Sequence, residues 1–538
     1  SELFIYWFKT GKTAKISHLE ESPSSITWSP NGTQIAFTMK VKDKPKVMVK
    51  MPQKPKGAKW AKSPRITTRL KHEADGTGYL TPGFHHLFTI SSEGGTANQL
   101  TTGNFNHKGK LSWSLNGNEI YFSSNRNDNW EYDFVNSELY KINVSTSEIT
   151  ALTNKKGPDH TPMLSPNGKY IAYLGFNDKI QAYQITQLRL LDIKSSTSVN
   201  LSRNIDRSIK SAIWSNDSKG LYISYDDRGF RKISFLKLNG EISEIVSDVG
   251  GTSLGRPYSG GSFSVSNNGI IAYTHSKPNR PSDVALASIK NNTPNVITHL
   301  NDDVLNNKIL GNVEEVNYKS SIDGRDIQGW IVTPPNYDAS KKYPLLVENH
   351  GGPILNYGPM FSLEMQLYAA AGYVVFYPNP RGSTSYGEVF GNLLYNNYPG
   401  EDYNDVMDGV DYLIENNKVD SKNLFVTGGS AGGIMTAWII GKNQRFNAAV
   451  VAKPVVNWIS KTLVADNYYN YANYRYVGQP WENYENYWKF SPLSLVGNIE
   501  TPTMVMVGMK DLRTPPSEAK QLYHALKIRK IETVLVEI

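Results

Sequence analysis

The sequence contains no cysteine. This absence excludes disulfide bonds, a thiol nucleophile and cysteine-rich zinc sites. The sequence also lacks an uninterrupted apolar run of about 18 residues, the length that a membrane-spanning helix needs, so we expect no membrane span. No motif implies a metal ion or an organic cofactor, and we expect neither.

Neither sign of charge dominates the sequence. Lysine and arginine number 57 against 49 aspartate and glutamate, a net charge of +8 over 538 residues. The basic residues are spread along the chain, and their densest group, between Lys40 and Lys62, is interleaved with proline and glycine as in a solvated loop. We therefore expect no nucleic-acid partner.

The sequence around Ser1 lacks the basic and apolar regions of a signal peptide and is already strand-like. This leaves the compartment open between the bacterial periplasm or secretion and the cytoplasm, with the periplasm favoured. The length suits two domains, or three, because a single core does not grow that large.

A short unit recurs in residues 1–311, each time as a turn between two strand-like segments. From Ser114 onward its copies lie about 50 residues apart, the spacing of β-propeller blades. We predict that residues 1–311 form an all-β propeller, incomplete at its N-terminus, with an insertion between Lys50 and Gly83. The copies are marked by Ser29, Ser114, Ser165, Ser215 and Ser266.

Residues 312–538 have a different pattern, in which apolar strand-like runs alternate with helical stretches. This pattern predicts a doubly wound α/β domain. The motifs described below make it an expected α/β-hydrolase domain, and the family resemblance implies that it is incomplete at its C-terminus. Residues 401–416 form one clear amphipathic helix. We expect its acidic residues to form a solvated face rather than a metal site; they are Asp402, Asp405, Asp408 and Asp411.

The segment around Ser430 has the pattern Gly428-x-Ser430-x-Gly432, preceded by a strand-like run and followed by a helical one. Glycines at these positions let the backbone form the strained turn that exposes a nucleophilic serine. A glycine-rich turn without chemistry is the alternative, but the strand and the helix on either side favour a nucleophile elbow. Ser430 is therefore the predicted nucleophile.

Two further segments fit acyl transfer. The N–H of Ala431 and the N–H of Gly352, in a His-Gly-Gly segment after a strand, are the predicted oxyanion donors. We expect His350 to hold this loop rather than to transfer protons. Asp511 follows the apolar run 503–507 and precedes a predicted helix at 516–527, which is the place of the triad acid.

These motifs, together with residues 349–353, 379–383 and 511–515, resemble the prolyl oligopeptidase family, in the branch that includes acylaminoacyl peptidases. The resemblance implies cleavage of oligopeptides, with the propeller lying over the active site and excluding large folded substrates. It also implies that Ser430 is the nucleophile, that Asp511 orients the base, and that Gly352 and Ala431 bind the oxyanion.

The family places its histidine base in a loop after the last strand, which here is the run 533–538, and no histidine stands there. We expect that this histidine belongs to the protein but lies beyond Ile538, and that the chain as written is nearly inactive. His524 falls off the apolar stripe of its helix, so we interpret it as a surface residue.

The resemblance also bears on specificity. The dipeptidyl peptidase branch has a tyrosine after the nucleophile, and here Ala431 makes a strict preference for proline unexpected. Val455 and Trp458 are expected near the first substrate pocket, which would be apolar or aromatic. The aromatic segment 468–488 is interpreted as a packed surface loop, with a place in the chamber wall as the alternative.

The leading hypothesis is thus a serine peptidase that forms an acyl-enzyme with short peptides. One alternative is an esterase on the same fold, and another is a propeller binding protein whose hydrolase domain is a relic. Homo-oligomerisation and the choice between exopeptidase and endopeptidase action are left open by the sequence.

Overall fold

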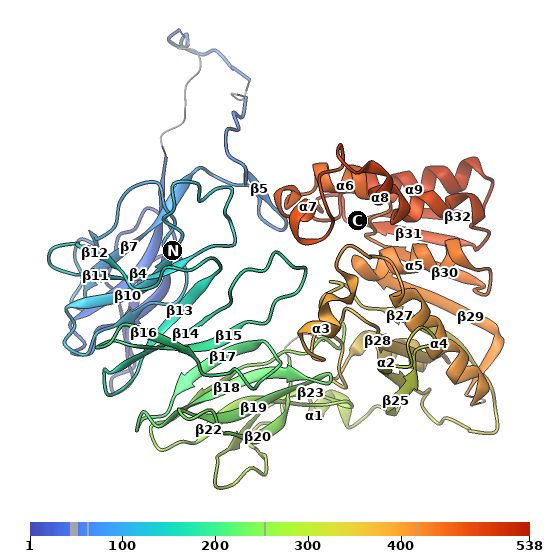
Figure 1. Cartoon of the computed structure of the whole chain (residues 1–538), viewed down its shortest axis with the longest axis horizontal. Helices are drawn as coiled ribbons and strands as arrows, with labels where there is room; N and C mark the ends of the chain where they lie inside the picture. The colour runs from blue at the N-terminus through green and yellow to red at the C-terminus, as the bar shows by residue number, and fades with distance from the viewer. Residues whose placement is uncertain (44–51, 62–63, 252–253, 417) are drawn as a thin grey trace. The chain divides into compact units, whose positions relative to one another are not determined.

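The computed structural model describes residues 1–43, 52–61, 64–251, 254–416 and 418–538 (Figure 1). It divides into two compact units, one of residues 1–177 with 190–198 and one of residues 178–189 with 199–538. The predicted domain boundary at residue 311 does not coincide with this division and stays a prediction. Parts of the predicted insertion between Lys50 and Gly83, and of the basic group between Lys40 and Lys62, lie outside the described residues.

The first unit consists of antiparallel strands. Four of its sheets have the orders β1-β2, β3-β4-β7-β8, β5-β6 and β12-β11-β10-β9. A further sheet has the order β13-β14-β15-β16, and its last two strands each contain residues of both units. The strands are β1 Phe4–Trp7, β2 Lys12–Lys15, β3 Ser24–Trp28, β4 Gln34–Lys42, β5 Glu73–Ala74, β6 Gly78–Tyr79, β7 Gly83–Ser91, β8 Asn98–Gln99, β9 Ser112–Trp113, β10 Glu119–Ser124, β11 Glu138–Asn143, β12 Ile149–Ala151, β13 Asp159–Leu164, β14 Tyr170–Gly175, β15 Gln187–Asp192 and β16 Thr197–Asn200.

Every copy of the repeated sequence unit forms the same turn. In the first copy, Ser29 Oγ donates a hydrogen bond to Asn31 Oδ1 at 2.8 Å, and Gly32 adopts a φ of +71°, which glycine tolerates without strain. Each turn is therefore held by bonds within its own few residues. The matching bonds from Ser114, Ser165, Ser215 and Ser266 measure 2.7, 2.8, 2.7 and 2.5 Å.

In the second unit, antiparallel strands of the blade type precede the α/β domain. A sheet of order β17-β18-β19-β20 continues through β22 to β23 and β24, with β21 beside β22. Tyr222, Ile233 and Val249 are buried in its core. The elements are β17 Ile209–Trp214, β18 Gly220–Asp227, β19 Phe230–Lys237, β20 Ile242–Val249, β21 Phe263–Val265, β22 Ile271–Lys277, β23 Arg280–Ala287, β24 Asn295–Val296 and helix α1 Asp302–Leu305.

An eight-stranded sheet of order β25-β26-β28-β27-β29-β30-β31-β32 forms the centre of the α/β domain. β25, β26 and β28 pair antiparallel, whereas the strands from β28 to β32 pair parallel, so their carboxyl ends share one edge. The strands are β25 Val313–Lys319, β26 Asp326–Val332, β27 Tyr343–Asn349, β28 Val374–Asn379, β29 Val419–Gly429, β30 Ala448–Ala452, β31 Thr503–Val507 and β32 Thr533–Glu537.

Helices connect these strands, and the two helices predicted from the sequence are both present. The predicted helix 401–416 is α4, and the predicted helix 516–527 is α9. In the described part of the chain, none of the helices is long and apolar enough to cross a membrane. The helices are α2 Leu363–Ala370, α3 Glu388–Gly391, α4 Asp402–Glu415, α5 Ala431–Lys442, α6 Trp458–Val464, α7 Tyr471–Tyr474, α8 Tyr484–Lys489 and α9 Pro516–Ile528, with 3₁₀ turns η1 Asn392–Leu394, η2 Tyr468–Asn470 and η3 Pro492–Asn498.

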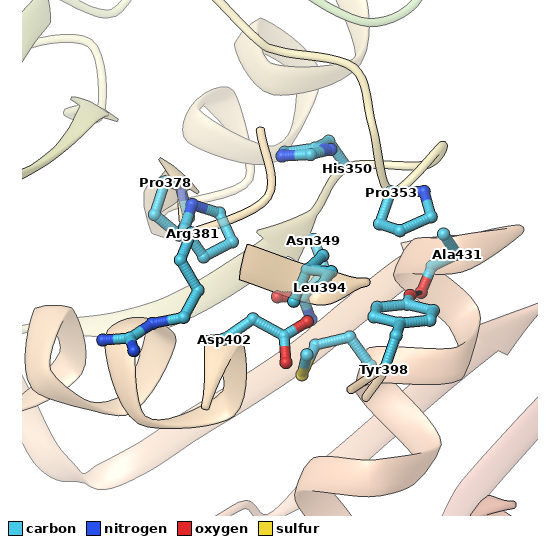
Figure 2. Close-up of a pocket in the computed structure, with 11 residues that line it drawn as sticks. Asn349, His350, Pro353, Pro378, Arg381, Leu394, Tyr398, Asp402 and Ala431 are labelled. Carbon is cyan, nitrogen blue, oxygen red and sulfur yellow. Dashed lines mark hydrogen bonds between the residues drawn. The ribbon is translucent and has the colours of Figure 1, made fainter. Parts of the chain in front are cut away.

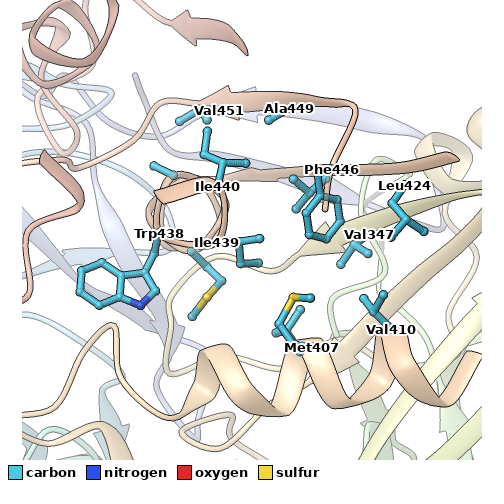
Figure 3. Close-up of a cluster of buried hydrophobic side chains, with 14 of the residues drawn as sticks. Val347, Met407, Val410, Leu424, Trp438, Ile439, Ile440, Phe446, Ala449 and Val451 are labelled. Atoms are coloured by element: carbon cyan, nitrogen blue, oxygen red, sulfur yellow. The ribbon is translucent and has the colours of Figure 1, made fainter. Parts of the chain in front are cut away.

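The core of the α/β domain lies around helix α5 (Figure 3). Val347 from β27, Val410 from α4 and Ile439 from α5 are all fully buried there. Burying each such side chain contributes roughly 1.5–3 kcal/mol. Because every residue of α5 from Ala431 to Gly441 is buried, the helix that follows Ser430 is fixed on all sides.

The expectation of a solvated acidic face on α4 is wrong for two of its four aspartates. Asp405 is fully buried, and its carboxylate accepts bonds of 2.9 Å from both Nε and Nη2 of Arg381. Asp402 is also buried, and it accepts a bond of 2.6 Å from the Gly400 N–H. Arg381 and a backbone N–H thus replace the water that the helix pattern alone suggests.

Candidate active site

The sharp turn at Ser430 joins the end of β29 to the start of α5. Ser430 has φ +59° and ψ −120°, a strained conformation for a residue with a side chain. A Cβ atom added to Gly428 would lie 2.5 Å from the carbonyl oxygen of Gly432, so the turn closes only with glycine. The structure therefore forms the elbow that the glycine spacing predicts.

The backbone N–H groups at this turn have different surroundings. Ser430 N donates to the carbonyl of Ala452 at 3.1 Å. Ala431 is the first residue of α5, where an N–H has no acceptor within the helix and the helix dipole favours negative charge. The Ala431 N–H thus differs from the Ser430 N–H, which already has a carbonyl acceptor.

The loop after β27 lies beside the elbow. His350 is buried at its start, with Nδ1 2.8 Å from the carbonyl oxygen of Gly351 and Nε2 2.9 Å from Ser383 Oγ. Burial lowers the pKa of His350 to about 4. A neutral ring with both nitrogens engaged fits the expected role of holding the loop.

Gly351 and Gly352 bring this loop close to Ser430. A Cβ atom on Gly351 would lie 3.6 Å from the Cβ of Ser430, and Gly352 adopts a φ of +121° that favours glycine. The Gly351 N–H donates to Tyr258 Oη at 2.8 Å. Among the residues that the structure describes, none accepts a hydrogen bond from the Gly352 N–H.

Asp511 lies in the loop after β31, at the same sheet edge as Ser430. Its Oδ1 accepts bonds from the N–H groups of Arg513 at 2.9 Å and Thr514 at 2.7 Å. Its Oδ2 accepts a bond of 2.8 Å from Thr514 Oγ1. The carboxylate is therefore held in one orientation, half-buried, next to the carboxyl end of β32, where Met509 N donates to the Ile538 carbonyl at 2.8 Å.

The two histidines of residues 312–538 lie elsewhere. His524 is exposed on α9, as its helical position predicts, and His350 is held as described above. Within the described residues, no hydrogen bond joins a histidine to Ser430 or Asp511, and no three acidic or histidine side chains converge as metal ligands.

Val455 and Trp458 belong to the same buried cluster as Ala431, the residue that follows Ser430. The rings of Trp458 and Tyr476 have centroids 5.3 Å apart. The interpretation of the aromatic segment as a surface loop is wrong for its buried tyrosines, which complete this cluster, whereas Trp481 and Trp488 are exposed. The buried tyrosines of the cluster are Tyr476 and Tyr487.

Glu518 of α9 fixes the segment that carries these residues, a role that no sequence motif indicated. Its Oε2 accepts bonds from the N–H groups of Val456 at 3.0 Å and Asn457 at 2.9 Å. Burial raises the pKa of Glu518, while these bonds act in the opposite direction.

A small cavity of about 20 Å³, large enough for about one water molecule, is lined in part by Ala431 (Figure 2). His350, Tyr398 and Asp402 contribute to its wall. Burial raises the pKa of Asp402 to about 7. This cavity adjoins the elbow but is too small to hold a peptide side chain.

Comparison of the sequence with family profiles and with known proteins identifies the family to which the chain belongs. The profile of the prolyl oligopeptidase family matches residues 359–538, and that of the dipeptidyl peptidase IV N-terminal region matches residues 42–178. The uncharacterized peptidase YuxL of Bacillus subtilis is 30% identical across 100% of this chain and 82% of its own length. The chain belongs to the prolyl oligopeptidase family. The resemblance seen in the sequence motifs is thereby confirmed.

Other members of the prolyl oligopeptidase family are similar over part of their length. Dipeptidyl-peptidase 5 of Schizosaccharomyces pombe is 27% identical over 74% of this chain and 57% of its own length. The solved acylaminoacyl peptidase of Pyrococcus horikoshii superposes with a TM-score of 0.82 at 21% identity, covering 100% of this chain and 80% of the other. This likeness confirms the predicted fold, a propeller followed by an α/β-hydrolase domain.

As a member of the prolyl oligopeptidase family, the protein is a serine peptidase that acts on peptides. The family does not by itself say which residues of this chain do the chemistry. The predicted roles of Ser430, Asp511, Gly352 and Ala431 stay predictions, as do those of Val455 and Trp458.

Proposed function

We propose that the protein hydrolyses short peptides through an acyl-enzyme on Ser430. The observation that carries this proposal is the strained turn at Ser430, which opens helix α5 and lies beside Gly351, the neighbour of Gly352. Two N–H groups at that position stabilise the oxyanion of a tetrahedral intermediate.

Each predicted residue has a part in this reaction. Ser430 Oγ attacks the peptide carbonyl carbon and loses its proton to a general base, and the N–H groups of Gly352 and Ala431 bind the oxyanion. The base then protonates the departing amine, leaving an ester on Ser430 that water hydrolyses. Asp511, held by Arg513 and Thr514, is placed to orient that base.

We propose that the first substrate pocket is apolar and accepts aromatic side chains. Val455 and Trp458 support this, because they belong to the buried apolar cluster that includes Ala431, the residue after the proposed nucleophile. A solved acylaminoacyl peptidase with a TM-score of 0.82 holds Z-Gly-Gly-Phe-chloromethyl ketone, a compound with phenylalanine next to its reactive group. A proline requirement is not supported, since Ala431 offers no aromatic ring of its own.

The test uses the full-length protein and a fluorophosphonate that labels activated serines. We expect one adduct by intact mass, at Ser430, and none in Ser430→Ala. Peptides that release a reporter after phenylalanine should be cleaved faster than those that release it after proline. Trp458→Ala should reduce that difference with little effect on fluorophosphonate labelling.

Two results would contradict the proposal. Labelling or cleavage that survives in Ser430→Ala would show that another residue is the nucleophile. Hydrolysis of simple esters without any cleavage of peptides would favour the esterase alternative.

A further inference from the structure

A loop of the blade-type strands lies against residues 350–353, the loop after β27, which is called the oxyanion loop here for its proposed role. This segment, residues 254–259, lies between β20 and β21 in the chain, within the second compact unit, and is referred to here as the 254–259 loop. Leu363 N donates to the Leu254 carbonyl at 2.7 Å, and Gly358 N donates to the Pro257 carbonyl at 2.9 Å. The loop is thus bonded to the hydrolase backbone along its length.

Tyr258 projects from this loop to the glycines beside Ser430. Its hydroxyl oxygen accepts the hydrogen bond from Gly351 N–H at 2.8 Å. Its ring packs on Tyr357 with centroids 4.7 Å apart. Burial raises the pKa of Tyr258, so the hydroxyl is neutral at physiological pH.

The geometry of the two glycines shows what this bond does. Gly351 C=O and Gly352 N–H belong to one planar peptide, so the bond from His350 to the Gly351 carbonyl directs the Gly352 N–H to the opposite side. Gly351 itself has no side chain to limit rotation between this peptide and the preceding one. Tyr258 holds the preceding peptide through the Gly351 N–H, and the two bonds together fix the direction of the Gly352 N–H.

Arg256 fixes the 254–259 loop to the hydrolase domain. Its Nε lies 3.1 Å from a carboxylate oxygen of Glu364 and 3.3 Å from one of Glu348. Glu348 is fully buried and also accepts a bond of 3.1 Å from Tyr357 Oη. Since Glu348 lies on β27, just before the oxyanion loop, this pair joins the base of that loop to the segment that carries Tyr258.

We propose that Tyr258 is a positioning residue for the peptidase reaction: by accepting the Gly351 N–H, it orients the Gly352 N–H toward the oxyanion at Ser430. The inference rests on the proposed function, because it assigns Tyr258 to the oxyanion site of that nucleophile. Tyr258 touches neither the substrate nor the reacting atoms in this role.

The experiment compares Tyr258→Phe with Tyr368→Phe in the full-length protein. Tyr368 is a matched control, because its hydroxyl donates to Glu364 at 3.0 Å in the same cluster but does not reach the oxyanion loop. We expect Tyr258→Phe to lower kcat about 10- to 100-fold with KM changed less than about 3-fold, since a misdirected oxyanion donor weakens binding of the transition state alone. Tyr368→Phe should keep the kcat of the unchanged protein.

Fluorophosphonate labelling separates positioning from misfolding. The final extent of labelling counts the folded sites, whereas the rate of labelling reports the oxyanion donors, because the phosphoryl oxygen of the adduct occupies the oxyanion position. For Tyr258→Phe we expect full extent at a rate reduced about 10- to 100-fold.

Three results would overturn the inference. If kcat per labelled site is unchanged in Tyr258→Phe, Tyr258 has no positioning role. The proposed function would still stand in that case, provided that Ser430→Ala is inactive. A rise in KM with kcat unchanged would instead make Tyr258 a substrate-binding residue. Activity that survives in Ser430→Ala would overturn both proposals together.

Discussion

The carbonyl oxygen of Asn349 lies where a side chain on Gly432 would have to be: a Cβ atom on Gly432 would stand 1.9 Å from it. Asn349 ends β27 and Gly432 is the second residue of α5, so the strand that leads to the loop of Gly351 and Gly352 and the helix that follows Ser430 touch backbone to backbone. The distance between the oxyanion loop and Ser430 therefore depends on the absence of one methyl group.

Gly432→Ala should abolish fluorophosphonate labelling of the full-length protein, since the strand and the helix must separate to admit the methyl group. We expect labelling to fall below a hundredth of its normal rate, in line with about 10²-fold for a displacement of 1 Å. Gly497→Ala is the matched control, because that glycine is exposed and a Cβ there meets nothing within 4 Å. Normal labelling of Gly432→Ala would show that the contact is not needed.

Asp511→Asn should lower kcat about 10³- to 10⁴-fold while the protein stays folded. The amide oxygen can still accept the bonds from Arg513 N and Thr514 N, but the amide cannot stabilise a positively charged base. Steady-state kinetics on a peptide substrate measure the effect. Asp338→Asn is the control, because Asp338 accepts a similar bond from Ser340 N at 3.0 Å before the amino end of β27. Equal activity of both variants would remove Asp511 from the site.

Arg381→Met should lower the free energy of unfolding by about 3–5 kcal/mol, because it leaves the carboxylate of Asp405 buried without its partner. The double variant Arg381→Met with Asp405→Leu should recover part of that loss, since no charge then remains buried. Thermal unfolding of the four proteins of this cycle measures the coupling. Additive effects of the two substitutions would show that the pair is not coupled.

Asp402→Asn should change how stability depends on pH. Burial raises the pKa of Asp402 from 3.8 to about 7, so between these values the folded state keeps a proton that the unfolded state loses. The stability that this group contributes is present below pH 4 and is lost as the pH rises through 7. We expect the asparagine variant to avoid this loss and to gain at most about 4 kcal/mol over the unchanged protein at pH 8.

Melting temperatures measured between pH 4 and pH 8 check this expectation. The difference between Asp402→Asn and the unchanged protein should grow between pH 4 and about pH 7 and level off above it. A difference that is the same at both ends would mean that the carboxyl of Asp402 does not change its protonation there.

The parts of the structure that depend on near neighbours could be predicted from the sequence. The elbow at Ser430 is specified by glycines within two residues of it, and each blade turn is held by a serine and an asparagine or aspartate two positions apart. Helices α4 and α9 follow from the spacing of their apolar residues. In these cases the residues that interact are also close in the chain.

The contacts that could not be predicted join residues far apart in the sequence. Tyr258 meets Gly351 across 93 residues, and neither Tyr258 nor Arg256 belongs to a recognisable motif. From the helix pattern alone, Asp405 is expected to be a solvated carboxylate. Its partner Arg381 lies 24 residues earlier, outside the helix, and the pattern of apolar residues gives no information about it. Glu518 likewise holds Val456 across 62 residues.

The bond between Tyr258 and Gly351 limits how this protein can be recombined. A chimaera that exchanged the blades for those of a relative would also exchange the acceptor of an N–H beside the nucleophile. Such a hybrid should work only if the donor blades bring a hydroxyl to the same place, or if residues 254–259 are retained from this chain. We therefore expect residues 254–259 and residues 349–353 to vary together among relatives of this protein.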